Sequence, residues 1–267
     1  DRAINIVNEA LTRFGAPIYV RHEIVHNAYV VNELRDKGAI FVDDLHEVPK
    51  GGIVVGRAQG GSQEVRRDAQ NRGLQVYDAT CPLVTKVHLE VVKMCKEGFT
   101  VLMIGHAGHP EVEGTMGQVK EGIFLIEKVE DLESLTFTAD QKIAFVTQTT
   151  LSVDETKEIV DALTKKFPNI VKPRKQDICY ATQNRQDAVK AMIPHVDVVI
   201  VVGSQNSSNS KRLQELATSL QVPAFLVDDP SQIKAEWFKS VDSIGVTAGA
   251  SAPESLTAKI IEAINSR

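Results

Sequence analysis

The sequence predicts an α/β protein built from two or three similar domains, each with a parallel sheet covered by helices. Short apolar, β-branched runs bounded by Gly, Pro or Asp alternate with helical patterns along the chain. Five times a buried strand runs into a loop of small polar residues and then into a helix. The chain has 267 residues and 43% hydrophobic content, enough for a substantial core.

The expected elements follow in chain order. An amphipathic helix covers residues 1–15, with Ile4, Val7, Leu11 and Phe14 at helical spacing. Strands are expected at residues 17–20, 39–44, 52–56, 100–105, 122–127, 142–148, 197–203, 224–229 and 243–247. Further helices are expected at residues 27–38, 62–73, 84–98, 153–168, 184–195, 209–220 and 253–266, several of which end in Gly or Pro.

Charge and cysteine content disfavour several classes of protein. A net charge of -5 argues against a nucleic-acid partner, because phosphate backbones are held by clustered Lys and Arg. No apolar run approaches the roughly 18 residues that a membrane span needs, and no signal peptide is recognisable. Cys81, Cys95 and Cys179 are an odd number of widely separated cysteines, which is typical of free thiols. We therefore expect a cytoplasmic protein.

Ligands in open α/β sheets bind outside the carboxyl ends of the strands, so the functional residues are expected in the strand-end loops. Two of these loops are rich in hydroxyl and amide groups at a predicted helix start, where free N–H groups favour an anion such as a diphosphate. The alternative is that these residues only cap helices. The loop residues are Ser204, Asn206, Ser207, Ser208, Asn209 and Ser210, and Thr147, Thr149, Thr150 and Ser152.

Known nucleotide-binding loops are not found. The stretch "GRAQGGSQ" is close to a phosphate-binding loop but has Ser62 where that motif needs Lys, and no GxGxxG follows a strand. An ATPase or a dinucleotide enzyme is therefore disfavoured.

Two cysteines stand where a short extended segment turns into a helix. A helix N-terminus stabilises a thiolate, so Cys81 and Cys179 suit metal ligation or nucleophilic catalysis, although either could be buried packing. Cys95 lies within a helical pattern and is expected to be a small core residue.

The stretch "GHAGHPEVEGT" follows the apolar strand at residues 100–104. His109, like His26 in another predicted strand-end loop, can stabilise phosphate charge, and Glu111 can deliver a proton. The alternative for Glu111 is structural, because Pro110 suits the first helical position and an acidic residue there complements the helix dipole.

Seven stretches together resemble the motif set of the 4-hydroxy-3-methylbut-2-enyl diphosphate reductase (IspH or LytB) family. They occur in the family's order along the whole chain: "YVRHEIVHN", "DATCPLVTKVH", "GHAGHPEVEGTMGQ", "TQTTLSVD", "DICYATQNRQ", "VVGSQNSSNS" and "TAGASAP". The resemblance implies three similar α/β domains around a central cluster and active-site cavity, which we place at residues 1–80, 81–178 and 179–267.

The resemblance also implies a four-iron, four-sulfur (4Fe-4S) cluster held by three cysteines, of which Cys81 and Cys179 match two. The third lies in the family in a loop immediately before the position of Asp1, and this sequence does not include it. By the same resemblance, Glu111 supplies protons and Thr149 orients the substrate hydroxyl. The implied diphosphate ligands are His26, His109, Ser207, Asn209 and Ser251, with Ser208 nearby.

The implied reaction is a two-electron, two-proton removal of an allylic hydroxyl that gives isopentenyl and dimethylallyl diphosphates. The chain has no nicotinamide or flavin motif, so a ferredoxin or flavodoxin is the implied electron donor. Gln59 stands where the family has a His that contacts the diphosphate, and we expect this exchange to weaken diphosphate binding by about 1 to 3 kcal/mol.

Two alternatives remain at this point. A cluster-free protein that only binds a phosphate ester would agree with Gln59 and with two cysteines in place of three. A metal-dependent phosphate-ester hydrolase would use His26, His109 and Glu111, but the carboxylate-rich metal loops that it needs are not found.

Overall fold

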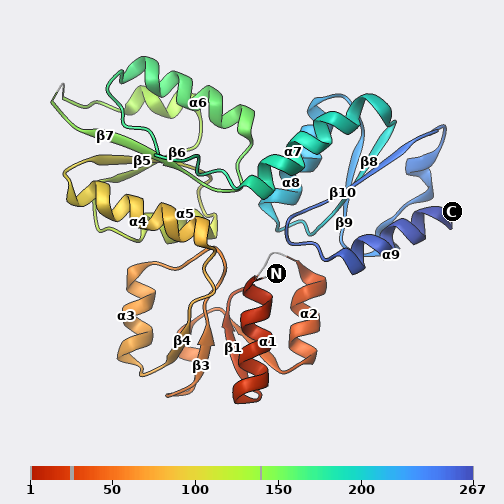
Figure 1. Cartoon of the computed structure of the whole chain (residues 1–267), viewed down its shortest axis with the longest axis horizontal. Coiled ribbons are helices and arrows are strands. Elements are labelled where there is room, and N and C mark those ends of the chain that lie inside the picture. The colour runs from red at the N-terminus through yellow and green to blue at the C-terminus, as the bar shows by residue number, and fades with distance from the viewer. Residues whose placement is uncertain (1, 25–26, 139, 267) are drawn as a thin grey trace. The chain divides into compact units, whose positions relative to one another are not determined.

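The computed structural model describes residues 2–24, 27–138 and 140–266 and contains three small parallel sheets, each accompanied by helices (Figure 1). This confirms the predicted fold class and the number of sheets. Within the described residues, no helix combines the length and the apolar character that crossing a membrane requires.

The first sheet has the strand order β2-β1-β3-β4. Its strands are Ala39–Val42, Ile18–Arg21, Ile53–Val55 and Gln75–Tyr77, and all neighbours are parallel. The same stretch of the chain contains helices α1 (Arg2–Phe14), α2 (Ala28–Asp36) and α3 (Gln63–Asn71). Strand β4 was not predicted, because it has only three residues and lacks a buried apolar run.

The second sheet has the order β6-β5-β7, with β5 at Thr100–Ile104, β6 at Ile123–Ile126 and β7 at Ile143–Thr147. Helices α4 (Pro82–Lys96) and α5 (Pro110–Met116) pack on one face, where Val87, Val91 and Val112 meet Val101 and Met103. Helix α6 (Val153–Lys166) packs on the other face. Strands β5 and β7 are parallel, so the loops that follow them lie at the same edge of the sheet. Both strands are buried, which anchors these loops.

The third sheet has the order β10-β8-β9, with β8 at Val198–Val202, β9 at Ala224–Val227 and β10 at Ile244–Ala248. Helices α7 (Tyr180–Met192) and α8 (Ser208–Ser219) cover one face, and α9 (Glu254–Asn265) covers the other. Short 3-10 helices occur at Leu45–Glu47, Val129–Ser134, Ile193–His195, Pro230–Gln232 and Ala235–Phe238.

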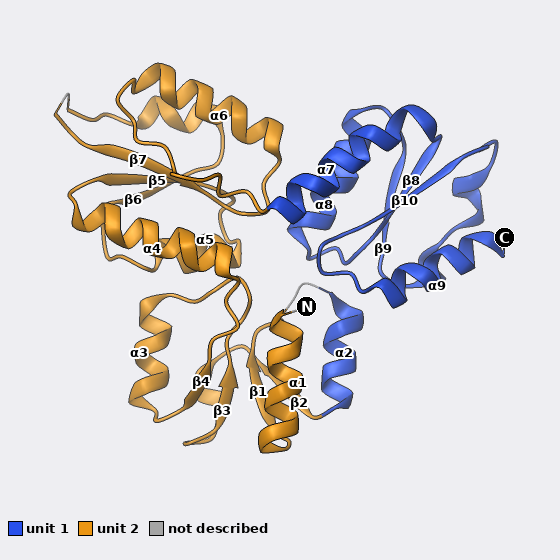
Figure 2. Cartoon of the chain, viewed as in Figure 1, with its two compact units in different colours: residues 1, 25–37, 180–267 blue, residues 2–24, 38–179 orange. Residues whose placement is uncertain are grey.

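The chain divides into two compact units (Figure 2). One contains the described residues 27–37 and 180–266, and so includes α2 together with the third sheet. The other contains residues 2–24 and 38–179, with the first and second sheets. The three predicted domains each contain one of the sheets, and their exact boundaries stay a prediction.

Candidate active site

Glu111 is a buried acidic side chain at the carboxyl end of the second sheet. It lies in the first turn of α5, just after β5, and is 2% exposed. Its carboxylate accepts two hydrogen bonds from Thr149 in the loop after β7, from the backbone N–H at 2.6 Å and from the hydroxyl at 2.8 Å. The two strand ends thus hold the carboxyl group from both sides.

Burial raises the pKa of Glu111 to about 7, because desolvation disfavours the charged carboxylate. The two hydrogen bonds from Thr149 act in the opposite direction, and the nearby Asp177 carboxylate adds a smaller upward contribution. A carboxyl group with a pKa near neutrality can both hold and release a proton at physiological pH, as a general acid must.

His109 caps the same helix. Its Nδ1 accepts a hydrogen bond from the backbone N–H of Glu111 at 3.1 Å. Because Nδ1 is the acceptor, this hydrogen bond assigns the proton of a neutral ring to Nε2, which can donate to an anion. Pro110 occupies the first helical position, as expected. The structural explanation of this motif is therefore confirmed, and the catalytic role of Glu111 stays a prediction.

Cys81 and Cys179 both immediately precede a helix. Cys81 is the N-cap residue of α4, and its backbone N–H donates to the Ala58 carbonyl at 2.8 Å. Cys179 precedes α7, and its backbone N–H donates to the Thr149 carbonyl at 2.9 Å. Both thiols are free and half-buried. Thr149 therefore contacts Glu111 through its N–H and hydroxyl, and Cys179, a predicted cluster ligand, through its carbonyl.

The loop that carries Gln59 is packed tightly against its neighbours. Gly60 has a φ of +80°, and a Cβ on it would lie 2.5 Å from the ring of His88 on α4. Gly114 of α5 packs so closely on the other side that a Cβ there would lie 3.2 Å from the Gly60 carbonyl oxygen. The side-chain oxygen of Gln59 is buried and has no partner among the described residues. The loop is fixed, and this oxygen is left as a hydrogen-bond acceptor.

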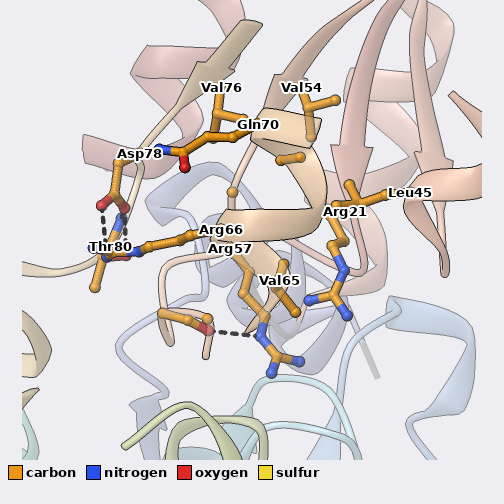
Figure 3. Close-up of a pocket in the computed structure, with 14 residues that line it drawn as sticks. Arg21, Leu45, Val54, Arg57, Val65, Arg66, Gln70, Val76, Asp78 and Thr80 are labelled. Atoms are coloured by element: carbon orange, nitrogen blue, oxygen red, sulfur yellow. Dashed lines mark hydrogen bonds and ion pairs between the residues drawn. The ribbon is translucent and has the colours of Figure 1, made fainter. Parts of the chain in front are cut away.

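Arg57 adds a positive charge to this loop, and only 9% of the residue is exposed. Its Nε donates to the Gly60 carbonyl at 2.9 Å, and an Nη donates to the Pro110 carbonyl at 3.2 Å. Arg57 and Arg21 line a cavity of about 250 Å³ together with apolar residues including Val54 and Val65. Figure 3 shows these four side chains. Arg57 thus ties the Gln59 loop to the start of the helix that carries Glu111.

An ion pair between a partly exposed lysine and a buried carboxylate joins the two segments that carry the cysteines. The Nζ of Lys86 on α4 lies 2.6 Å from a carboxylate oxygen of Asp177, whose side chain is fully buried. The other oxygen of Asp177 accepts from the backbone N–H of Thr147 at 3.0 Å. Since Lys86 follows Cys81 by five residues and Asp177 precedes Cys179 by two, this pair fixes both segments against the end of β7.

The other unit contributes a separate set of polar loop residues. Ser207 caps α8 and accepts from the backbone N–H of Ser210 at 3.3 Å. Asn209 accepts from the backbone N–H of Ala250 at 2.8 Å, which joins the loop after β8 to the loop containing Ser251. The Nδ2 of Asn209 is buried without a partner in the described part of the chain. Helix capping and ligand binding are compatible here, because an uncommitted donor remains.

The structure therefore brings the predicted site residues together in two groups. Gln59, Cys81, His109, Glu111, Thr149 and Cys179 form one group in the unit that contains the first two sheets. Ser207, Asn209 and Ser251 lie on joined loops of the other unit, where Ser208 begins α8. His26 lies outside the described residues. In the described residues, no three His, Cys, Asp or Glu side chains are grouped as metal ligands.

Three further residues of the site were not predicted from the sequence, namely Arg57, Lys86 and Asp177. The partners Lys86 and Asp177 are 91 residues apart, so no local pattern pairs them. Arg57 stands in the strand-end loop "GRAQGGSQ", and its position in such a loop was the one available signal.

Parallel strand ends with free cysteines, a buried carboxyl group of raised pKa and capping His, Ser and Asn residues define a small-molecule enzyme of the α/β class. The sequence profile of the LytB protein family matches residues 1–265. The chain belongs to this family, which confirms the resemblance seen in its motifs.

Several relatives share the enzyme name 4-hydroxy-3-methylbut-2-enyl diphosphate reductase. The relative from Ralstonia nicotianae is 63% identical over 262 residues, which cover 98% of this chain and 81% of the relative. The relative from Tolumonas auensis is 60% identical over 265 residues, which cover 98% of this chain and 86% of the relative.

Two solved structures are similar to the chain. The E-1-hydroxy-2-methyl-but-2-enyl-4-diphosphate reductase of Plasmodium falciparum superposes with a TM-score of 0.96 at 42% identity and covers 98% of this chain and 82% of its own. A structure titled (E)-4-hydroxy-3-methyl-but-2-enyl diphosphate reductase, the terminal enzyme of the non-mevalonate pathway, gives a TM-score of 0.70 at 31% identity, with coverages of 100% and 94%.

Proposed function

We propose that the chain is the reductase that removes the allylic hydroxyl of 4-hydroxy-3-methylbut-2-enyl diphosphate and forms isopentenyl and dimethylallyl diphosphates. Family membership and the shared enzyme name of the relatives support this reaction over a cluster-free binding protein. The structural observation that carries it is the buried carboxyl group of Glu111, which Thr149 holds and whose pKa is about 7.

The reaction consumes two electrons and two protons and breaks one C–O bond. One proton leaves with the hydroxyl oxygen as water, and the other is added to carbon in the product. Glu111 supplies the proton to the leaving oxygen, because its raised pKa keeps it protonated to a large extent at neutral pH. Thr149 holds the carboxyl group and orients the substrate hydroxyl.

Diphosphate binding is assigned to residues that can donate hydrogen bonds. The proposed diphosphate-binding residues are His26, Gln59, His109, Ser207, Ser208, Asn209 and Ser251. The unpartnered Nδ2 of Asn209 supports this assignment, because it is a buried donor without an acceptor among the described residues.

Cys81 and Cys179 are proposed as two ligands of a 4Fe-4S cluster. Two free, half-buried thiols at helix starts fit this group, because a helix N-terminus favours the thiolate that iron binds. When bound, the cluster supplies electrons and a Lewis acid for the hydroxyl oxygen. The resemblance implies a third cysteine ligand that lies in the family before the position of Asp1, and the matched residues cover 81% of the relative from Ralstonia nicotianae.

A ferredoxin or flavodoxin is the proposed electron donor, because the sequence has no nicotinamide or flavin motif of its own. A cytoplasmic location also stays a prediction, supported by the three free cysteines.

Anaerobic turnover tests the proposal. The protein is reconstituted with iron and sulfide, supplied with 4-hydroxy-3-methylbut-2-enyl diphosphate and reduced methyl viologen, and its products are separated by chromatography. We expect isopentenyl and dimethylallyl diphosphates, and one product molecule for every two electrons consumed. Binding of the substrate without either product would support the cluster-free binding protein instead.

A further inference from the structure

A basic groove of about 430 Å³ lies on the second sheet's side of the molecule, between one face of α4 and the segment 171–175. Five basic and two acidic residues line it, whereas the chain as a whole carries a net charge of -5. Lys172, Arg174 and Lys175 are exposed, and none of them forms an ion pair within the described residues. The groove is therefore a local positive patch on an acidic protein.

The lining of this groove also includes exposed apolar side chains. Leu89 on α4 is 65% exposed and Val171 is 40% exposed. An apolar centre with a charged rim is the usual composition of a protein-binding surface. A small polar metabolite would leave Leu89 in water, so the groove fits a protein partner better.

Hydrogen bonds to the backbone of segment 171–175 hold the groove in one shape. Val171 is bonded to the edge of β7, with its N–H donating to Ile143 at 2.9 Å and its carbonyl accepting from Phe145 at 3.2 Å. The Nζ of Lys86 donates to the Lys175 carbonyl at 2.7 Å, which ties the segment to α4. A surface that is ordered before binding loses little entropy when a partner docks.

The two walls of the groove are the elements that carry the predicted cluster ligands. Helix α4 begins directly after Cys81, and Lys86 is little more than one turn further along it. The segment 171–175 ends four residues before Cys179. A protein seated in this groove therefore touches both elements that lead to the two thiols.

We propose that this groove docks a small acidic one-electron carrier protein, which delivers electrons to the site between the two cysteines. The inference rests on the proposed reductase function. The docking surface for the electron donor is defined by the position of Leu89 and by the positive charges of Lys172 and Arg174. Opposite charge steers such a partner to the groove and sets its association rate.

The test compares a protein donor with a small-molecule donor. The charge-reversed variant K172E/R174E and the apolar variant L89A are prepared with a matched control, K50E/K165E, which reverses two exposed lysines that do not line the groove. Turnover is measured with reduced plant-type ferredoxin and, separately, with reduced methyl viologen. Binding of oxidised ferredoxin is measured by calorimetry at low ionic strength.

We expect K172E/R174E to lower kcat/KM for ferredoxin roughly tenfold or more and L89A roughly fivefold, while methyl viologen turnover stays within about twofold of wild type. Ferredoxin binding should weaken with salt in the wild type and lose this dependence in K172E/R174E. Equal ferredoxin kinetics and binding in K172E/R174E and K50E/K165E would overturn the docking proposal.

A second outcome would also overturn the docking proposal. If K172E/R174E abolished a self-association of the wild type and left ferredoxin binding intact, a second copy of the chain would be the occupant of the groove. Failure of the reductase function itself looks different. It would show as no turnover of the wild type with methyl viologen, whereas the binding measurement still tests the groove.

Discussion

Replacing Glu111 with Gln removes the titrating proton and preserves the shape of the site. A Gln oxygen can still accept from the Thr149 N–H, and its amide can donate to the Thr149 hydroxyl oxygen. The substitution therefore changes protonation and leaves packing and hydrogen bonds in place, which makes its pH dependence interpretable.

The expected size of the effect follows from the pKa of Glu111. Folding raises this pKa from 4.5 to about 7, so the folded protein binds a proton more tightly than the unfolded chain does. The protonated carboxyl group contributes its full stability below about pH 4.5. This contribution is lost as pH rises to about 7, because ionisation then places a charge in a site that is 2% exposed. A rise from 4.5 to about 7 corresponds to about 3 kcal/mol of unfolding free energy.

Chemical denaturation of metal-free protein between pH 4.5 and 8 measures this difference. We expect wild type to lose about 3 kcal/mol of unfolding free energy relative to Glu111→Gln across this window. Glu113→Gln is the matched control, because Glu113 lies on the same helix and its side chain is 61% exposed. Parallel pH profiles of wild type and Glu111→Gln would refute the assigned pKa. In turnover, Glu111→Gln should lower kcat by roughly 100-fold to 10,000-fold.

Three further substitutions test neighbouring contacts. Gln59→His should tighten diphosphate binding by about 1 to 3 kcal/mol if it restores a charge-assisted bond, and calorimetry showing unchanged affinity would contradict this. Thr149→Val removes the hydroxyl bond that lowers the pKa of Glu111. The pH profile of kcat should therefore move to higher pH, and an unmoved profile would count against the contact. Lys86→Met leaves the buried Asp177 carboxylate unpaired and should cost roughly 3 to 5 kcal/mol of unfolding free energy, which a second change, Asp177→Asn, should partly restore.

The fold was largely predictable because its strands are short, β-branched and buried on both faces. The runs at Val198–Val202 and Ile143–Thr147 are completely buried, and their sequences show it directly. Strand β4 was missed for the opposite reason, since Gln75 and Val76 are exposed and no apolar pattern marks them. The division of the chain into two compact units, with α2 grouped with the third sheet, has no signal in local sequence.

The site was predictable in residue type and only partly in role. The sequence places Cys81, His109 and Glu111 at strand ends, but from the residues alone the structural explanation of Glu111 was the more plausible one. Only the fold shows that Thr149 buries and holds that carboxyl group. The Lys86–Asp177 pair could not be predicted, because one sequence contains no information on which charges meet across 91 residues.

The assignment of Cys81 and Cys179 as cluster ligands beside Glu111 is tested most directly by the iron and acid-labile sulfide content of reconstituted protein. Wild type and three single variants, Cys81→Ser, Cys179→Ser and Cys95→Ser, are prepared anaerobically and analysed together with their visible spectra. We expect equal amounts of bound iron and sulfide in wild type and Cys95→Ser, and loss of both in Cys81→Ser and Cys179→Ser. Equal iron and sulfide in all four proteins would contradict the assignment.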